Sequence, residues 1–159
     1  MRVLPLLTAL AAGLLLSTGL LAVPDRPPKN NKADPLAEEA RKLQGTWEFV
    51  AFEYRGRHYN AAQLNAKFGN PKLIITKDKV TGTFSNQTAT IPLKIDPKAN
   101  PKGIELTGLR FAPRGVVPAI YELEGDTLKT CFHRAGKKRP TGFKTDPLAF
   151  IMIWKRAKP

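Results

Sequence analysis

The side chains best suited to chemistry are few in this sequence, and their spacing fits no familiar site. His58 and His133 are the only histidines, and Cys131 is the only cysteine, among 159 residues. No His-x-x-x-His or Cys-x-x-Cys pair occurs, so a zinc site would lack its ligands. The sequence also contains no Gly-x-Ser-x-Gly nucleophile elbow and no phosphate-binding loop. We therefore predict no catalytic residue, no metal and no cofactor, and we expect that the protein is not an enzyme.

Carboxylates leave one route to acid–base chemistry open. Glu48, Glu53, Glu105 and Glu122 fall on different predicted strands, and two of them could converge as an acid–base pair. The alternative is that they form a solvated strand face or pair with the abundant lysines. Cys131 has no partner for an internal disulfide, and we interpret it as a buried, inert thiol.

Basic residues outnumber acidic ones by 26 to 13, which gives a net charge of +13. The densest cluster, made of Arg134, Lys137, Lys138 and Arg139, predicts a patch for an anionic partner such as an envelope polymer or a lipid headgroup. No aromatic residues interleave with this cluster, so we do not expect nucleic acid as a partner. A loop that is merely solvated is the alternative.

The first residues have the pattern of an export signal. Met1 and Arg2 precede an almost wholly apolar run over residues 3–21, and small residues stand at Gly19 and Ala22. This pattern is typical of a secretory signal peptide over residues 1–22, cleaved after Ala22 or Gly19. No cysteine lies near the junction, so a lipid-anchored form is not expected. We predict export to the periplasm or the extracellular space; a transmembrane anchor is the alternative.

The rest of the chain divides into a tether and one domain. Residues 23–34 contain three prolines and almost no apolar side chains, which favours an extended tether. Residues 35–159 are enough for one hydrophobic core but not for two domains.

A short helix is expected where the tether ends. Asp34 can cap it, Pro35 suits its first position and Gly45 can end it. Its apolar face is predicted to carry Leu36, Ala40 and Leu43. We expect this helix to pack across a barrel mouth.

Alternation of apolar residues between turn residues predicts eight strands after this helix. They cover residues 46–54, 71–76, 79–85, 88–95, 103–107, 118–123, 127–133 and 148–154, with a short helix or irregular lid over 61–68. No segment has the form of a βαβ unit, so we expect antiparallel pairing. The predicted fold class is all-β, a small eight-stranded antiparallel up-and-down barrel with a short N-terminal helix.

Gly45, Trp47 and Arg156 are the residues expected to close this barrel. Trp47 stands early on the first strand, where its indole could stack on a ligand or plug the closed end. We favour the plug, with Arg156 or Lys155 from the last strand covering the ring by a cation–π contact.

The interior of the barrel decides between two functions. Eight strands enclose a space that is either filled by side chains or able to hold one small ligand. If it holds a ligand, the protein is a binding module for a small apolar molecule. If it is filled, the protein is a structural or interaction domain whose basic rim contacts anionic envelope partners. The residues predicted to contact a ligand are Phe49, Ile75, Phe84, Leu93, Leu106, Phe132 and Met152.

Five ordered blocks of the sequence resemble one family. They are Leu43-Gln44-Gly45-Thr46-Trp47; Asp96-Pro97 with Asn100-Pro101-Lys102; the run from Ile120 to Lys129 with Cys131; Arg139-Pro140-Thr141 with Phe143; and Lys155-Arg156. In these blocks the chain is similar to the lipocalin-like domain family of planctomycete bacteria, which has no established function. The resemblance implies a lipocalin-like fold and an exported bacterial protein, and it supplies no catalytic residues. Thr141-Gly142-Phe143 departs from the family pattern, which usually has an acidic residue between Thr and Phe.

Overall fold

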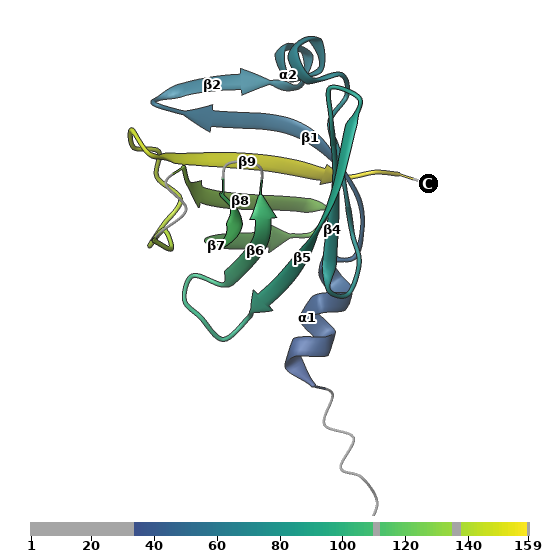
Figure 1. Ribbon diagram of the computed structural model, residues 1–159, viewed down its shortest axis with the longest axis vertical. Helices are drawn as coiled ribbons and strands as arrows, with labels where there is room; N and C mark the ends of the chain where they lie inside the picture. The colour runs from purple at the N-terminus through teal and green to yellow at the C-terminus, as the bar shows by residue number, and fades with distance from the viewer. Residues whose placement is uncertain (1–33, 110–111, 135–137, 159) are drawn as a thin grey trace, which may run out of the picture. The chain divides into compact units, whose positions relative to one another are not determined.

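The computed structural model describes residues 34–109, 112–134 and 138–158, which form an antiparallel barrel with a helix at one end (Figure 1). The predicted signal peptide, the predicted tether up to residue 33, and Lys137 of the basic cluster lie outside these residues. Among the described residues, no helix is long and apolar enough to cross a bilayer.

Two helices and nine strands make up the described part of the chain. The helices are α1 (Pro35–Leu43) and α2 (Ala61–Phe68). The strands are β1 (Gly45–Tyr54), β2 (Arg57–Asn60), β3 (Lys72–Ile75), β4 (Lys79–Phe84), β5 (Gln87–Asp96), β6 (Gly103–Leu109), β7 (Ala112–Glu124), β8 (Thr127–His133) and β9 (Ala149–Arg156).

Eight of these strands close into a barrel, which confirms the predicted fold class. From β3 to β9 each strand pairs antiparallel with the next along the chain, and β1 joins β3 on one side and β9 on the other. The connections are those of a meander, as in small lipocalin-like barrels.

The strand that the sequence did not predict is β2. It pairs with the end of β1 over residues 51–54, where β3 no longer accompanies that strand. Arg55 and Gly56 link the two strands with φ values of 52° and 71°, which is the backbone of a tight hairpin turn. The strand escaped prediction because Arg-His-Tyr-Asn shows no apolar alternation.

The prediction for β7 was too short. The strand begins at residue 112 rather than 118. The glycine at 115 and the proline at 118 interrupt the apolar pattern, but β7 pairs with β6 on both sides of a register shift. The other seven predicted strands lie within three residues of the observed bounds.

The N-terminal helix begins as predicted, but it buries a different face. Asp34 caps it by accepting a hydrogen bond from the Leu36 amide at 3.0 Å, and Pro35 stands at its first position. Leu43 is buried, whereas Leu36 remains 46% exposed. Glu39 is buried in place of Leu36, so the predicted apolar face was only partly right. Gln44 is the C-terminal cap, and Gly45 already belongs to β1.

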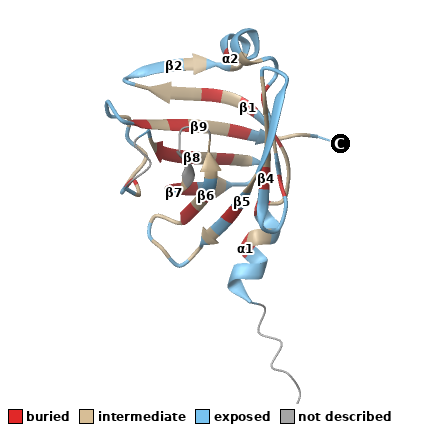
Figure 2. Ribbon diagram, in the orientation of Figure 1, coloured by how far each residue is buried: buried red, intermediate tan, exposed pale blue. Residues whose placement is uncertain are grey.

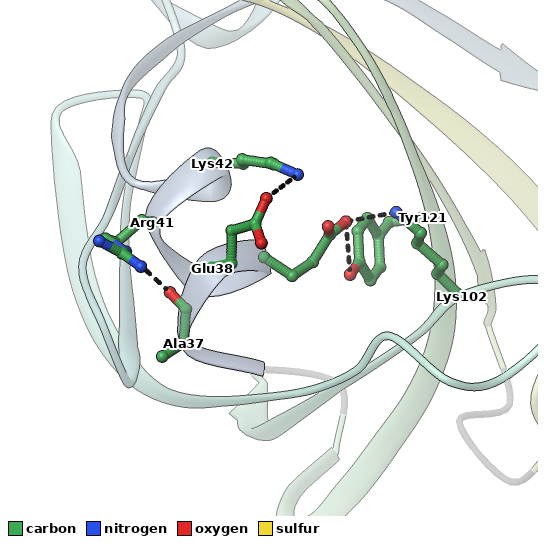
Figure 3. A network of polar contacts seen from close by, with 7 residues as sticks. Ala37, Glu38, Arg41, Lys42, Lys102 and Tyr121 are labelled. Atoms are coloured by element: carbon green, nitrogen blue, oxygen red, sulfur yellow. Dashed lines mark hydrogen bonds and ion pairs between the residues drawn. The ribbon is translucent and has the colours of Figure 1, made fainter. Parts of the chain in front are cut away.

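Glu39 fastens α1 to the barrel. Figure 3 shows Lys102 and Tyr121 converging on one carboxylate of the helix, with Oε1 of Glu39 lying 2.6 Å from Lys102 Nζ and 3.2 Å from the Tyr121 hydroxyl. Burial, followed by the nearby charge of Glu39, raises the pKa of Tyr121. The phenol therefore stays protonated and donates its hydrogen bond to Glu39.

One end of the barrel is closed by Gly45, Trp47 and Arg156, which the structure brings together. Trp47 is fully buried, its indole N–H donates to the Leu43 carbonyl at 2.9 Å, and the Arg156 guanidinium lies 4.2 Å from the ring centroid. That guanidinium also donates to the carbonyls of Gln44 and Lys42 at 2.7 and 2.8 Å. A Cβ on Gly45 would approach Arg156 Nη1 to 2.8 Å, and its φ of +131° suits glycine.

Two apolar clusters lie on opposite faces of the sheet. The main cluster lies inside the barrel and includes Trp47 as well as residues that line the cavity described below, such as Leu93, Leu106 and Leu128. A second one joins Ile120, Cys131, Ala149 and Ile151 with Phe143 and Ile153, and strand alternation places it on the outer face of β7, β8 and β9. Figure 2 shows buried residues along β1, β8 and β9 and mostly exposed ones on the β4–β5 hairpin.

Candidate ligand-binding cavity

The open part of the barrel contains a cavity of about 490 Å³. Its deep end is lined by the buried residues Leu93, Leu106, Leu128 and Trp154. At its other end it reaches Ala89, which is exposed although it faces the interior of the barrel. No charged residue is among the lining residues that the structure describes.

Strand alternation on β8 and β9 supplies one wall of the cavity. Leu128, Thr130 and Phe132 on β8 stand opposite Trp154, Met152 and Phe150 on β9. The alternate residues of the same strands, such as Cys131 and Ile151, belong to the outer cluster. Each face of these two strands packs in its own apolar cluster. A shift of one residue in their pairing register would therefore expose the apolar side chains of both clusters.

Six of the seven residues predicted to contact a ligand line the cavity. They are Ile75, Phe84, Leu93, Leu106, Phe132 and Met152. Phe49 is not among the lining residues: it is buried in the main cluster and stacks on Trp154 with ring centroids 4.4 Å apart. Phe49 therefore supports the cavity without lining it.

The cavity opens where β5 and β6 diverge. These strands pair over residues 93–96 and 103–106, and among the described residues no pairing continues toward the β4–β5 turn. The ladder between β6 and β7 shifts register between Thr107 and Leu109, around Gly108 with its φ of 82°. Such a bulge bends a strand. Cavity-lining residues stand on both sides of the split: Ala89 and Ile91 on β5, and Gly108 and Leu109 on β6.

The tip of the β4–β5 hairpin is held by α2 rather than by β6. The Ser85 amide donates to the Phe68 carbonyl at 2.6 Å, and the rings of Phe68 and Phe84 meet edge to face at 6.3 Å. Figure 1 shows this tip beside α2 and apart from the end of β6. The segment predicted as a helix or an irregular lid is thus a helix, α2, that contacts this tip.

Two polar groups belong to the buried part of the lining. Thr130 is 4% exposed, and its hydroxyl donates to the Met152 carbonyl at 3.4 Å, which is a long hydrogen bond. Trp154 is fully buried, and its indole N–H has no acceptor among the described residues. Neither residue was among those predicted from the sequence to contact a ligand. The alternation Leu128, Thr130, Phe132 was the available signal for Thr130.

The described members of the predicted basic cluster differ in their surroundings. Arg139 lies against β5 and β6, where it pairs with Asp96 at 3.5 Å and Glu105 at 3.2 Å. Arg134 is exposed and donates to the Tyr54 hydroxyl at 3.3 Å. Lys138 is exposed, and Lys137 lies outside the described residues. None of the described members of the cluster lines the cavity.

Three of the four candidate carboxylates pair with basic side chains. Glu48 lies 4.0 Å from Lys72, Glu53 lies 3.6 Å from His58, and Glu105 pairs with Arg139. Glu122 is exposed on β7. In the described part of the chain, no group of three or more His, Cys, Asp or Glu side chains is arranged to hold a metal ion. Cys131 is buried, as expected, and burial raises the pKa of its thiol to about 11.

Comparisons with protein-family models, with curated proteins and with solved structures found no match to this chain.

Proposed function

We propose that this protein is a binding module that takes up one small, mostly apolar molecule in its barrel. The observation that carries the proposal is the cavity of about 490 Å³, lined mostly by apolar side chains and reaching exposed residues at the β5–β6 split. Its volume lies within the range of about 300–1,000 Å³ that is usual for small-molecule sites. Transfer of an apolar molecule from water into such a space is favourable in proportion to the apolar area removed from water.

The lining selects against charged ligands. An ionised group inside the cavity would lose its hydration and would meet no opposite charge among the described lining residues. A charged part of a ligand must therefore stay outside the split.

The alternative, an interaction domain with a filled barrel and a basic rim, has weaker support. The cavity is larger than a packed core leaves, and the charge of Arg139 is balanced by Asp96 and Glu105. Export of the protein and its membership of the planctomycete lipocalin-like family remain parts of the proposal that rest on the sequence.

A neutral fluorescent probe tests the binding function. N-phenyl-1-naphthylamine, titrated into the protein, is expected to gain fluorescence with saturable, one-to-one binding. Ala89→Trp places a bulky ring where Ala89 lines the cavity, so it should weaken binding at least tenfold.

The neighbouring residue offers a matched control. Thr90 bonds to Thr81 across the exposed outer face of the same strand, so Thr90→Trp should leave probe affinity unchanged. Absence of binding to the parent protein, or equal loss of binding in both variants, would contradict the proposed function.

A further inference from the structure

The two tryptophans of the chain differ in whether the indole N–H has a hydrogen-bond acceptor. Both are fully buried, but Trp47 donates its indole N–H to the Leu43 carbonyl, whereas Trp154 has no acceptor among the described residues. A buried donor without an acceptor loses the hydrogen bond that water gave it in the unfolded chain. Such a donor in a native structure calls for an explanation.

The Trp154 ring cannot turn to solvent to satisfy its N–H. Phe49 stacks on it at a centroid distance of 4.4 Å and an interplanar angle of 21°, and Phe84 meets it at 6.3 Å and 83°. On the neighbouring strands it stands opposite Leu128 and Phe49. These rings hold the indole in place, and its N–H has no acceptor in the described part of the chain.

Trp154 is also part of the cavity wall, close to a second polar group. Thr130 lines the same wall, two residues from the Leu128 that faces Trp154. Its hydroxyl is only weakly engaged by the Met152 carbonyl. The buried part of the lining therefore holds two donor groups: the indole N–H of Trp154, which has no acceptor among the described residues, and the hydroxyl of Thr130, which makes only a long hydrogen bond.

We propose that the ligand carries an uncharged hydrogen-bond acceptor, such as a carbonyl or ether oxygen, at the end that enters first. That oxygen accepts the Trp154 indole N–H, and the Thr130 hydroxyl becomes a second donor when it turns away from the Met152 carbonyl. This inference rests on the proposed function and narrows its ligand class to neutral ketones, aldehydes, esters and ethers with a large apolar part. Hydrocarbons leave the donor unpaired. Carboxylates would bury a charge for which the described lining has no counter-ion.

An isosteric pair of ligands isolates the hydrogen bond. 2-Acetylnaphthalene and 2-isopropenylnaphthalene have the same shape and differ in a carbonyl oxygen against a methylene group. Dissociation constants for both are measured by calorimetry on the parent protein and on Trp154→Phe, which removes the N–H and keeps an aromatic ring. We expect the ratio of the two constants to change about tenfold between parent and variant, in disfavour of the ketone.

The other tryptophan provides the matched control. Trp47→Phe removes an N–H that is bonded within the closed end of the barrel, outside the cavity lining. The ketone-to-alkene ratio of this variant should equal that of the parent.

A second measurement needs no change at Trp154. The sequence has two tryptophans, so an ¹⁵N-labelled protein gives two indole N–H signals, and Trp47→Phe assigns them. The ketone should move the Trp154 signal downfield, and the alkene should not.

The outcomes separate the two proposals. If both ligands bind and neither the ratio nor the indole signal distinguishes them, the hydrogen bond to Trp154 is refuted and the binding function stands. If the parent binds neither ligand and no other neutral apolar probe, both proposals are overturned.

Discussion

At the scale of single residues, Trp47 on the first strand connects the N-terminal helix to the last strand of the barrel. Its indole fills the closed end, bonds to the last residue of α1 and lies under Arg156 of the last strand. Apolar packing, a hydrogen bond and a cation–π contact therefore all depend on this one indole ring.

Replacing Trp47 by Ala is expected to lower the free energy of unfolding by about 3–5 kcal/mol, as truncation of large buried aromatic residues does. Chemical denaturation followed by far-UV circular dichroism measures the change. An unchanged transition midpoint would show that Trp47 is not part of the core.

Cys131 yields a prediction about pH. Its pKa is raised from 9.0 to about 11, chiefly by burial, so the folded state holds the thiol proton more tightly than the unfolded state does. The stability gained in this way is complete below pH 9.0 and is lost as pH rises from 9.0 towards 11. Between these pH values the parent should lose more unfolding free energy than Cys131→Ala, as compared by urea titrations.

If the two proteins lose stability in parallel over this range, burial does not hold the Cys131 proton. In the parent at pH 8, labelling by a thiol reagent should also proceed no faster than global unfolding, because the thiol is buried on the covered face of β8.

At the scale of elements, Glu39 decides how α1 attaches to the barrel. Glu39→Ala leaves the Tyr121 hydroxyl buried without an acceptor and Lys102 without its ion pair. We expect a loss of about 1–3 kcal/mol in unfolding free energy.

Glu38 on the same helix is the control for Glu39. Its pair with Lys42 is solvent-exposed, with side chains 51% and 54% accessible, and such pairs contribute little. Glu38→Ala should therefore leave stability nearly unchanged. Equal effects of the two substitutions would show that Glu39 does not anchor the helix.

The same elements show what a sequence can and cannot predict. Period-2 alternation located eight strands, because each has one face on the barrel interior. The burial of Glu39 could not be foreseen, because its partners Lys102 and Tyr121 lie 63 and 82 residues away along the chain. Alternation also selected most of the cavity lining. The extent of the cavity could not be predicted in this way, because the end of the β5–β6 pairing at Leu93 and Leu106 and the register shift between β6 and β7 are long-range features that local patterning does not encode.

At the scale of the whole molecule, the net charge of +13 predicts attraction to anionic surfaces that weakens with salt. Arg139 contributes to two ion pairs, so the test is restricted to Arg134, Lys137 and Lys138. Replacing these three by Gln should lower the salt concentration at which the protein elutes from a heparin column, without changing its melting temperature.

Charge elsewhere on the surface provides the comparison. Lys77, Lys79 and Lys94 are exposed around the β3–β4 turn and on β5, and their replacement by Gln removes the same net charge. A larger shift for the first variant supports a specific basic surface. Equal shifts in elution for the two variants would show that net charge alone explains the binding to heparin. The predicted anionic partner would then lose its support.

The outer cluster on β7, β8 and β9 makes the barrel wall unequal in local stability. These strands are covered on both faces, by the main cluster inside and by Phe143 and its neighbours outside, whereas β4 and β5 are covered on one face and carry few buried residues. Amide hydrogens of β8 should therefore exchange with solvent only when the whole domain unfolds, and those of β4 and β5 through smaller local openings. The hairpin of β4 and β5 borders the split. We therefore expect a bound ligand to leave through local opening of this hairpin, while β7, β8 and β9 stay folded.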